Sequence, residues 1–316
     1  MNPRYTSPPE RLPKGGLELK SVPMPWTRRF FSTECPCGSG AKSYRCCWRG
    51  NGCWEKTPVS AINLPGISDR PSVNDRCYLS SFGGCSSKMT REHFVSRNIL
   101  ARVTTNKLTF ENAGHFFGGK GRVEIGVDDF VAKVLCDTHN GALGPLDAAA
   151  GLVFSTIEAL AKDVPRIADE KRALESFHIS SGLDIERWMI KVYCGLVGAG
   201  KIRSLSGQAL QRSALPSYLL DALLGNCFLP SPLGLYQNTF VGQTLNLGGL
   251  AFGTIKLTDG SDGVGGLMLS LGPVNFVLIT SMAYGQTFKE PIWYRHQTLV
   301  WNVKQGTSRV AYLLTY

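Results

Sequence analysis

Apolar residues recur at helical spacing in two segments near the middle of the chain. Between about 146 and 162 they lie on one face, and Pro165 is expected to end this helix. A second helix is expected over about 183 to 198, after a Ser-Gly start, and Cys194 within it is expected to be a buried, inert thiol. Both stripes predict core positions: Leu146, Val153, Phe154, Ile157 and Leu160 in the first, and Ile185, Trp188, Met189, Val192 and Leu196 in the second.

From about residue 230 the pattern becomes typical of β-strands. LAFGTIKLT and LMLSLGPVNFVLITS flank the turn-forming sequence DGSDGVGG, which predicts a hairpin. RHQTLVWNVKQGTSRVAYLLTY is expected to form two further strands with a turn at Lys304 to Thr307. Because helices and strands fall in separate regions, the sequence predicts an α+β fold.

Composition divides the 316 residues into six parts. They are a proline-rich flexible arm (1–25), a compact cysteine and tryptophan cluster (26–56), a linker (57–76), a second cysteine and histidine cluster with its following helix (77–160), a helical region (161–228) and a β-rich C-terminal region (229–316).

The basic charge is concentrated in the first 100 residues, which hold 15 Lys and Arg against 7 Asp and Glu, within a formal net charge of +10. A basic surface favours polyanions such as nucleic acid, and the alternative is a solvated face that only keeps the protein soluble. The polar start and the lack of a long apolar run predict neither a secretory signal nor a membrane span, so we expect a cytoplasmic protein that does not bind membranes.

Ten cysteines are present, eight of them in the first 140 residues, which in a reducing compartment indicates metal ligation rather than disulfides. Cys35, Cys37, Cys46 and Cys47 form CxCx8CC, which can complete a closed tetrahedral zinc site. The string CPCGSGAKSYRCC resembles the SEC-C zinc motif, found at the end of the preprotein translocase ATPase and in many unrelated proteins. The resemblance implies one structural zinc and a surface for a nucleic acid or acidic protein partner; the alternative is a zinc staple alone.

A second set of ligands, Cys77, Cys85, Cys136 and His139, predicts a structural Cys3His zinc site. Glu92 and His93 lie between its two pairs, and Asn140 follows the second pair. These are the parts for phosphodiester hydrolysis, with His93 as general base and with Glu92 and Asn140 holding Mg²⁺ or Mn²⁺. Neighbouring side chains on a strand point to opposite faces, so Glu92 and His93 converge only if the strand is kinked or ends there.

Arg91-Glu92-His93 and Cys136-Asp-Thr-His139-Asn140 resemble the HNH nuclease superfamily, whose ββα-metal finger is a hairpin followed by a helix. The resemblance implies the same roles for Glu92, His93 and Asn140, and structural zinc at the Cys3His set. Seven residues rather than two separate Cys77 from Cys85, and an insertion is expected around HFFGGKGR. The middle asparagine of the motif has three candidates: Asn98, Asn106 and Asn112.

The function expected from these residues is that of a metal-dependent endonuclease acting on nucleic acid, with double-stranded DNA as the substrate that the resemblance favours. Analogy with free-standing HNH proteins suggests a role in defence against foreign DNA, and cutting both strands suggests a homodimer. The alternative is a noncatalytic zinc-dependent nucleic-acid-binding or adaptor protein. Asp147 lies two helical turns beyond Asn140, where it either supports the site or is a favourable acid at a helix start.

Overall fold

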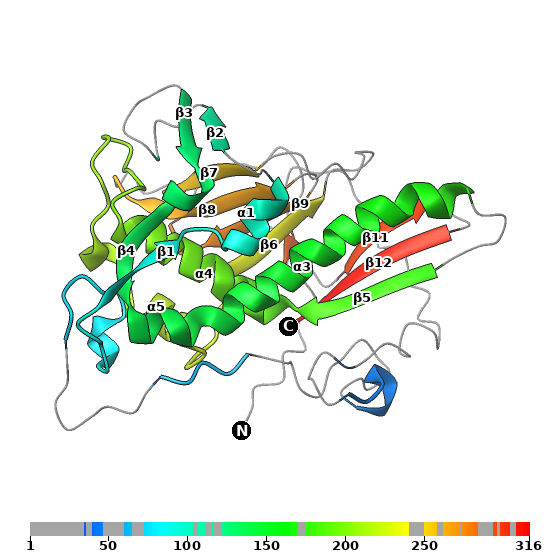
Figure 1. Ribbon diagram of the computed structural model, residues 1–316, viewed down its shortest axis with the longest axis horizontal. Helices are drawn as coiled ribbons and strands as arrows, with labels where there is room; N and C mark the ends of the chain where they lie inside the picture. Colours follow the sequence, from blue (N-terminus) through cyan, green and yellow to red (C-terminus); the bar gives the residue numbers. More distant parts are fainter. Residues whose placement is uncertain are drawn as a thin grey trace.

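The computed structural model (Figure 1) describes residues 35, 40–46, 60–64, 73–103, 107–111, 116, 122–169, 175–239, 250–257, 262–271, 274–283, 293–295, 298–303 and 308–316. These residues form an α+β fold, as the sequence predicts. Its described helices are α1 (Arg97–Val103), α3 (Asp137–Asp169), α4 (Gly182–Gly198) and α5 (Ser217–Leu224).

The strands belong to four sheets. Two are antiparallel pairs: β1 (Met89–His93) with β4 (Val131–Cys136), and β2 (Lys107–Glu111) with β3 (Arg122–Gly126). A five-stranded antiparallel sheet has the order β10-β6-β9-β8-β7, with β6 (Gly234–Thr239), β7 (Leu250–Lys256), β8 (Val264–Leu271), β9 (Val274–Ile279) and β10 (Trp293–Tyr294). In the fourth sheet, β12 (Ser308–Thr315) lies between β11 (Thr298–Val303), antiparallel, and β5 (Glu175–Ser181), parallel.

Helix α3 is longer than the sequence pattern predicts. It begins at Asp137 and continues through Pro165 to Asp169, so the expected end at this proline is wrong. A proline removes one hydrogen bond of a helix, but α3 packs along β5, β11 and β12 in this half, and such packing can hold a helix together. In Figure 1 α3 runs from the β1–β4 pair to the β5–β12–β11 sheet. In the described part of the chain no helix has the length and apolar character needed to cross a membrane.

Helix α4 is the centre of the core and confirms the second predicted helix. Ser181 caps it, because its side chain accepts a hydrogen bond of 3.1 Å from the backbone N–H of Asp184. The predicted stripe is buried, and so is every other residue from Gly182 to Val197. Cys194 is fully buried, and burial raises the pKa of its thiol, as expected for an inert cysteine.

The C-terminal strands follow the predicted pattern with one difference. The hairpin β7–β8 and the pair β11–β12 form where they are expected, while the turn at 304–307 lies outside the described residues. LMLSLGPVNFVLITS forms two strands, β8 and β9, rather than one. Strand β5, inside the region expected to be helical, was not predicted, because it pairs with β12, which lies more than 120 residues later in the chain.

Phe154 joins three elements of the core. Its ring centroid lies 5.6 Å from that of Trp188 on α4 and 5.8 Å from that of Phe276 on β9. Replacing Phe154 by Ala should lower the free energy of unfolding by about 3 to 5 kcal/mol, because a fully buried ring leaves a cavity. Urea unfolding measures the change. Leu152→Ala, in the same helix but 60% exposed, is the matched control and should change stability by about 0.5 kcal/mol or less.

Candidate active site

Three cysteines and one histidine converge at the start of α3. Cys77, Cys85, Cys136 and His139 are all buried, and their ligand atoms lie within 4.8 Å of one another. The Nδ1 atom of His139 lies 3.3 Å from the Sγ atoms of Cys77 and Cys136 and 3.5 Å from that of Cys85. In a tetrahedral zinc site, bond lengths of about 2.3 Å to sulfur and 2.0 Å to nitrogen put these atoms about 3.5 Å apart. The group therefore fits a metal such as Zn²⁺, as predicted.

The charge states of these thiols also depend on a cation. Burial raises the pKa of Cys77 to about 12, so this thiol stays protonated unless a cation replaces the proton. Burial also acts on Cys136, but backbone N–H groups, that of His139 first among them, outweigh it and lower its pKa. Burial lowers the pKa of His139, which keeps its imidazole neutral, the form that binds metal.

Strand β1 carries Glu92 and His93 at an irregular end. It pairs with β4, but the register shifts between Thr90 and Glu92, and the strand ends at His93. The strand is therefore irregular just before Glu92 and ends at His93, which meets the condition set by the sequence. Glu92 is 7% exposed and faces the interior, whereas His93 is only partly buried. Strands β1 and β4 pair antiparallel, and β4 leads directly into α3. Helix α1 and the β2–β3 hairpin lie between β1 and β4 in the sequence.

Glu92 is the centre of a polar cluster. The side chain of Asn140, in the first turn of α3, lies near enough to lower the pKa of its carboxyl group, so two of the residues predicted to act on one metal ion lie near each other. Burial raises the pKa of Glu92, while Lys191 and Asn140 oppose this shift. Lys191 on α4 forms ion pairs with Glu92 and with Asp147, the latter at 2.5 Å. Burial lowers the pKa of Lys191, but the two carboxylates outweigh it and raise the pKa overall.

Asp147 is fixed by hydrogen bonds from outside the cluster. Its Oδ1 atom accepts a hydrogen bond of 2.5 Å from Ser96 Oγ, which itself accepts one of 2.8 Å from Trp188 Nε1. Helix α1 approaches closely because Gly151 has no side chain: a Cβ atom there would lie 2.0 Å from Asn98 Nδ2. Since α3 begins at Asp137, the interpretation of Asp147 as a helix-start acid is wrong.

His93 lies at the surface beside basic residues. Its Nε2 atom is buried and has no hydrogen-bond partner in the described part of the chain. Burial, followed by the charge of Arg97, lowers the pKa of His93, which keeps the imidazole neutral near pH 7. Asp128 and Asp147 act in the opposite direction. A neutral imidazole with a free ring nitrogen can accept a proton.

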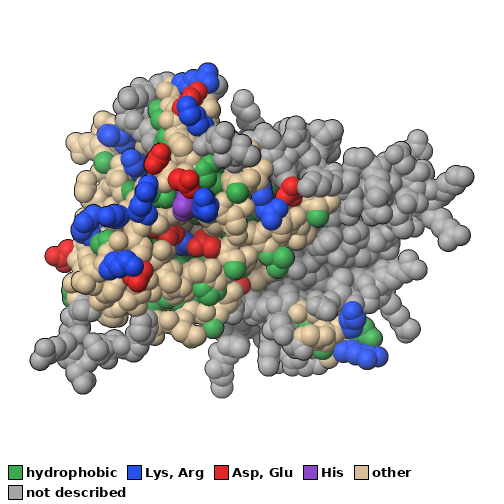
Figure 2. All heavy atoms as spheres, viewed as in Figure 1, with side chains coloured by type: hydrophobic (Ala, Val, Ile, Leu, Met, Phe, Trp, Pro, Cys, Tyr) green, Lys and Arg blue, Asp and Glu red, His purple; other side chains and the backbone are tan. Residues whose placement is uncertain are grey.

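Two exposed arginines next to His93 contact the same acidic turn. Arg91 donates to the Asp128 carbonyl at 2.9 Å and lies 3.5 Å from Asp129 Oδ1, and Arg97 donates to Asp128 Oδ1 at 3.2 Å. Figure 2 shows a histidine side chain on this face, surrounded by Lys and Arg side chains with acidic ones beside it. Exposed ion pairs contribute little stability, so an incoming phosphate can replace these carboxylates at small cost.

The first cysteine cluster is only partly described. Cys35 is buried and its N–H donates to the Ala41 carbonyl at 2.7 Å, and Cys46 is half-buried. Cys37 and Cys47 lie outside the described residues, as do Asn106 and Asn112, so the four-cysteine zinc site stays a prediction. Of the asparagine candidates, Asn98 donates to the Asp147 carbonyl at 3.4 Å.

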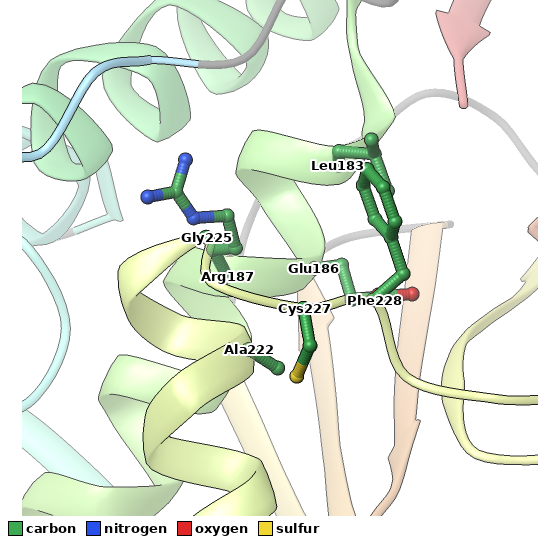
Figure 3. Close-up of a pocket in the computed structure, with 7 residues that line it drawn as sticks. All are labelled: Leu183, Glu186, Arg187, Ala222, Gly225, Cys227 and Phe228. Carbon is green, nitrogen blue, oxygen red and sulfur yellow. The ribbon is translucent and has the colours of Figure 1, made fainter. Parts of the chain in front are cut away.

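A separate cavity of about 120 Å³ lies beside α4 (Figure 3). It is lined by Leu183, Glu186, Arg187, Ala222, Gly225, Cys227 and Phe228. The carboxylate of Glu186 is held by Arg295 at 2.8 Å, and Arg187 pairs with Asp184 at 3.3 Å. The charged groups that line this cavity are therefore already paired within the core.

Lys191, which forms ion pairs with Glu92 and Asp147, is not among the site residues that the sequence predicts. The only signal available was a lysine one position before Val192 in the apolar stripe of α4, where such a residue needs a buried partner. The partners, Glu92 and Asp147, lie 99 and 44 residues earlier in the chain, so only the fold identifies them.

Removal of one ligand should destroy the Cys3His metal site. We expect Cys136→Ser to bind one zinc fewer than the unaltered protein and to melt at a clearly lower temperature, because metal binding contributes to folding. Metal analysis after gel filtration and thermal melting measure both. Cys227→Ser, at an exposed cysteine, is the matched control. Unchanged zinc content in Cys136→Ser would contradict the assignment.

Comparison of the chain with protein-family models, with curated proteins and with solved structures gives no match. The function proposed below therefore rests on the arrangement of Glu92, His93 and Asn140, on the charges around them, and on the resemblance of the sequence motifs.

Proposed function

We propose that this protein is a metal-dependent endonuclease that hydrolyses phosphodiester bonds of nucleic acid, with His93 as general base. The observation that carries the proposal is the placement of the three predicted residues at one junction: Glu92 and His93 end β1, which pairs with β4, and Asn140 lies in the first turn of α3, directly after β4. Carboxylate and amide oxygens, such as those of Glu92 and Asn140, are ligands that Mg²⁺ and Mn²⁺ prefer.

In the proposed reaction, the neutral imidazole of His93 takes a proton from the attacking water. The water oxygen forms a new bond to phosphorus, and the bond to the leaving oxygen breaks, which gives a phosphomonoester and an alcohol. Glu92 and Asn140 would hold a divalent cation, which would stabilise negative charge on the phosphate and the leaving oxygen. Arg91 and Arg97 hold neighbouring phosphates of the chain.

The Cys3His cluster serves this site as a structural clip. Cys136 ends β4 and His139 lies one residue before Asn140, so a zinc ion there would fix the strand pair against the first turn of α3. Double-stranded DNA is the substrate that we propose, from the sequence resemblance. A protein partner for the knuckle at 26–56 and a homodimer belong to the same proposal.

Loss of the general base or of a proposed metal-binding residue should slow cleavage strongly. We expect His93→Ala and Asn140→Ala to lower the rate of supercoiled plasmid cleavage in Mg²⁺ or Mn²⁺ by at least a factor of about 100, which is the smaller end of what general bases contribute. Nicked and linear products are followed on gels, with a chelator control. Asn226→Ala, at an exposed residue after α5, is the matched control and should cleave normally.

Cleavage that persists in a His93→Ala protein would contradict the role of His93. The noncatalytic alternative predicts a different pattern: a folded, zinc-loaded protein that binds nucleic acid and cleaves neither DNA nor RNA in any divalent metal.

The arginines beside His93 should contribute to binding through phosphates. Replacing Arg91 or Arg97 by Ala should weaken DNA binding and lower the slope of log K against log salt by about one each, because each phosphate contact releases about one counterion. Fluorescence anisotropy at several salt concentrations measures both quantities. Arg122→Ala, exposed on β3 and paired with Glu124, should leave the slope unchanged. A salt-independent affinity would contradict this electrostatic role.

A further inference from the structure

Lys191 places a positive charge between two carboxylates of the proposed site. Its ammonium forms ion pairs with Glu92 Oε1 and, at 2.5 Å, with Asp147 Oδ2. The side chain of Lys191 is 3% exposed, that of Glu92 9% and that of Asp147 30%. Asp147 is therefore the solvent-facing carboxylate of this group, and its charge also acts on His93.

The ammonium of Lys191 cannot leave this position at small cost. The side chain of Lys191 is 3% exposed, and its neighbours Ile190 and Val192 are also buried. Moving the ammonium away would also leave two carboxylates close together without a cation, which is strongly unfavourable in an interior of low dielectric. A divalent ion on Glu92 would therefore share this carboxylate with a fixed positive charge.

We propose that Lys191 sets the metal affinity of the site. Its ammonium neutralises Glu92 and Asp147 when no divalent cation is bound, and by repulsion it makes cation binding weaker than two carboxylates alone would. This inference rests on the proposed function. It extends the site from β1 and α3 to α4, which carries no sequence motif of the nuclease.

Manganese binding tests the inference without any nuclease assay. Zinc-loaded protein is titrated with Mn²⁺, and the free ion is followed by its electron paramagnetic resonance signal. We expect Lys191→Met to bind Mn²⁺ about tenfold more tightly than the unaltered protein, because a neighbouring positive charge is removed. Arg187→Met is the matched control, since Arg187 is a buried cation one turn earlier in α4 that pairs with Asp184 instead. Its Mn²⁺ affinity should not change.

An unchanged or weaker Mn²⁺ affinity in a Lys191→Met protein that melts cooperatively and keeps its zinc would overturn the inference. If this variant does not fold, nuclear magnetic resonance of the unaltered protein with ¹⁵N-labelled lysine replaces it. The ammonium signal of Lys191, assigned with Lys191→Arg, should shift as Mg²⁺ is added. A signal that stays unchanged up to millimolar Mg²⁺ would also overturn it.

The same titration separates this inference from the proposed function. If the unaltered protein binds Mn²⁺ and cleaves plasmid while Lys191→Met binds Mn²⁺ equally well, only the role of Lys191 is wrong. If neither protein binds Mn²⁺, the catalytic metal site and the role of Lys191 both fail. Binding that appears only in Lys191→Met supports the role of Lys191.

Discussion

A helix buried on every side must have a partner for each of its charged side chains. In α4 most of these partners come from other parts of the chain. Glu186 is held by Arg295, Arg187 by Asp184, and Lys191 by Glu92 and Asp147. Arg187 also donates to the Ser60 carbonyl at 2.8 Å, which fastens part of the predicted linker to the helix. These pairs connect α4 to segments far apart in the sequence and give it a fixed orientation in the core.

The candidate active site contains both the ion pairs of Lys191 and the nearby Cys3His cluster. The cluster lies at the junction of β4 and α3, while Lys191 on α4 forms ion pairs with Glu92 and Asp147. Near them, His93 is half-buried at the end of β1, and its Nε2 atom has no hydrogen-bond partner among the described residues. A site supported by both the cluster and these ion pairs is well suited to hold side chains at fixed distances, which phosphoryl chemistry requires.

The two functional hypotheses differ in what they ask of this arrangement. A nuclease needs the neutral imidazole of His93 and the oxygen ligands beside it, whereas a noncatalytic binding protein needs only the metal clip and the basic surface. Burial and the charge of Arg97 lower the pKa of His93, so its imidazole is in the neutral form that the first hypothesis requires.

Several features follow from the sequence alone. The α+β class, helix α4 and its core stripe, the hairpin β7–β8 and the Cys3His ligands are local patterns of spacing and residue type, and these need no knowledge of distant contacts. The structure decided what depends on long-range packing: the continuation of α3 through Pro165, the parallel pairing of β5 with β12, and the partners of Lys191. Periodicity says which side chains are buried but not which residues they meet, so the lysine that completes the candidate site became visible only once α4 was packed against β1 and α3.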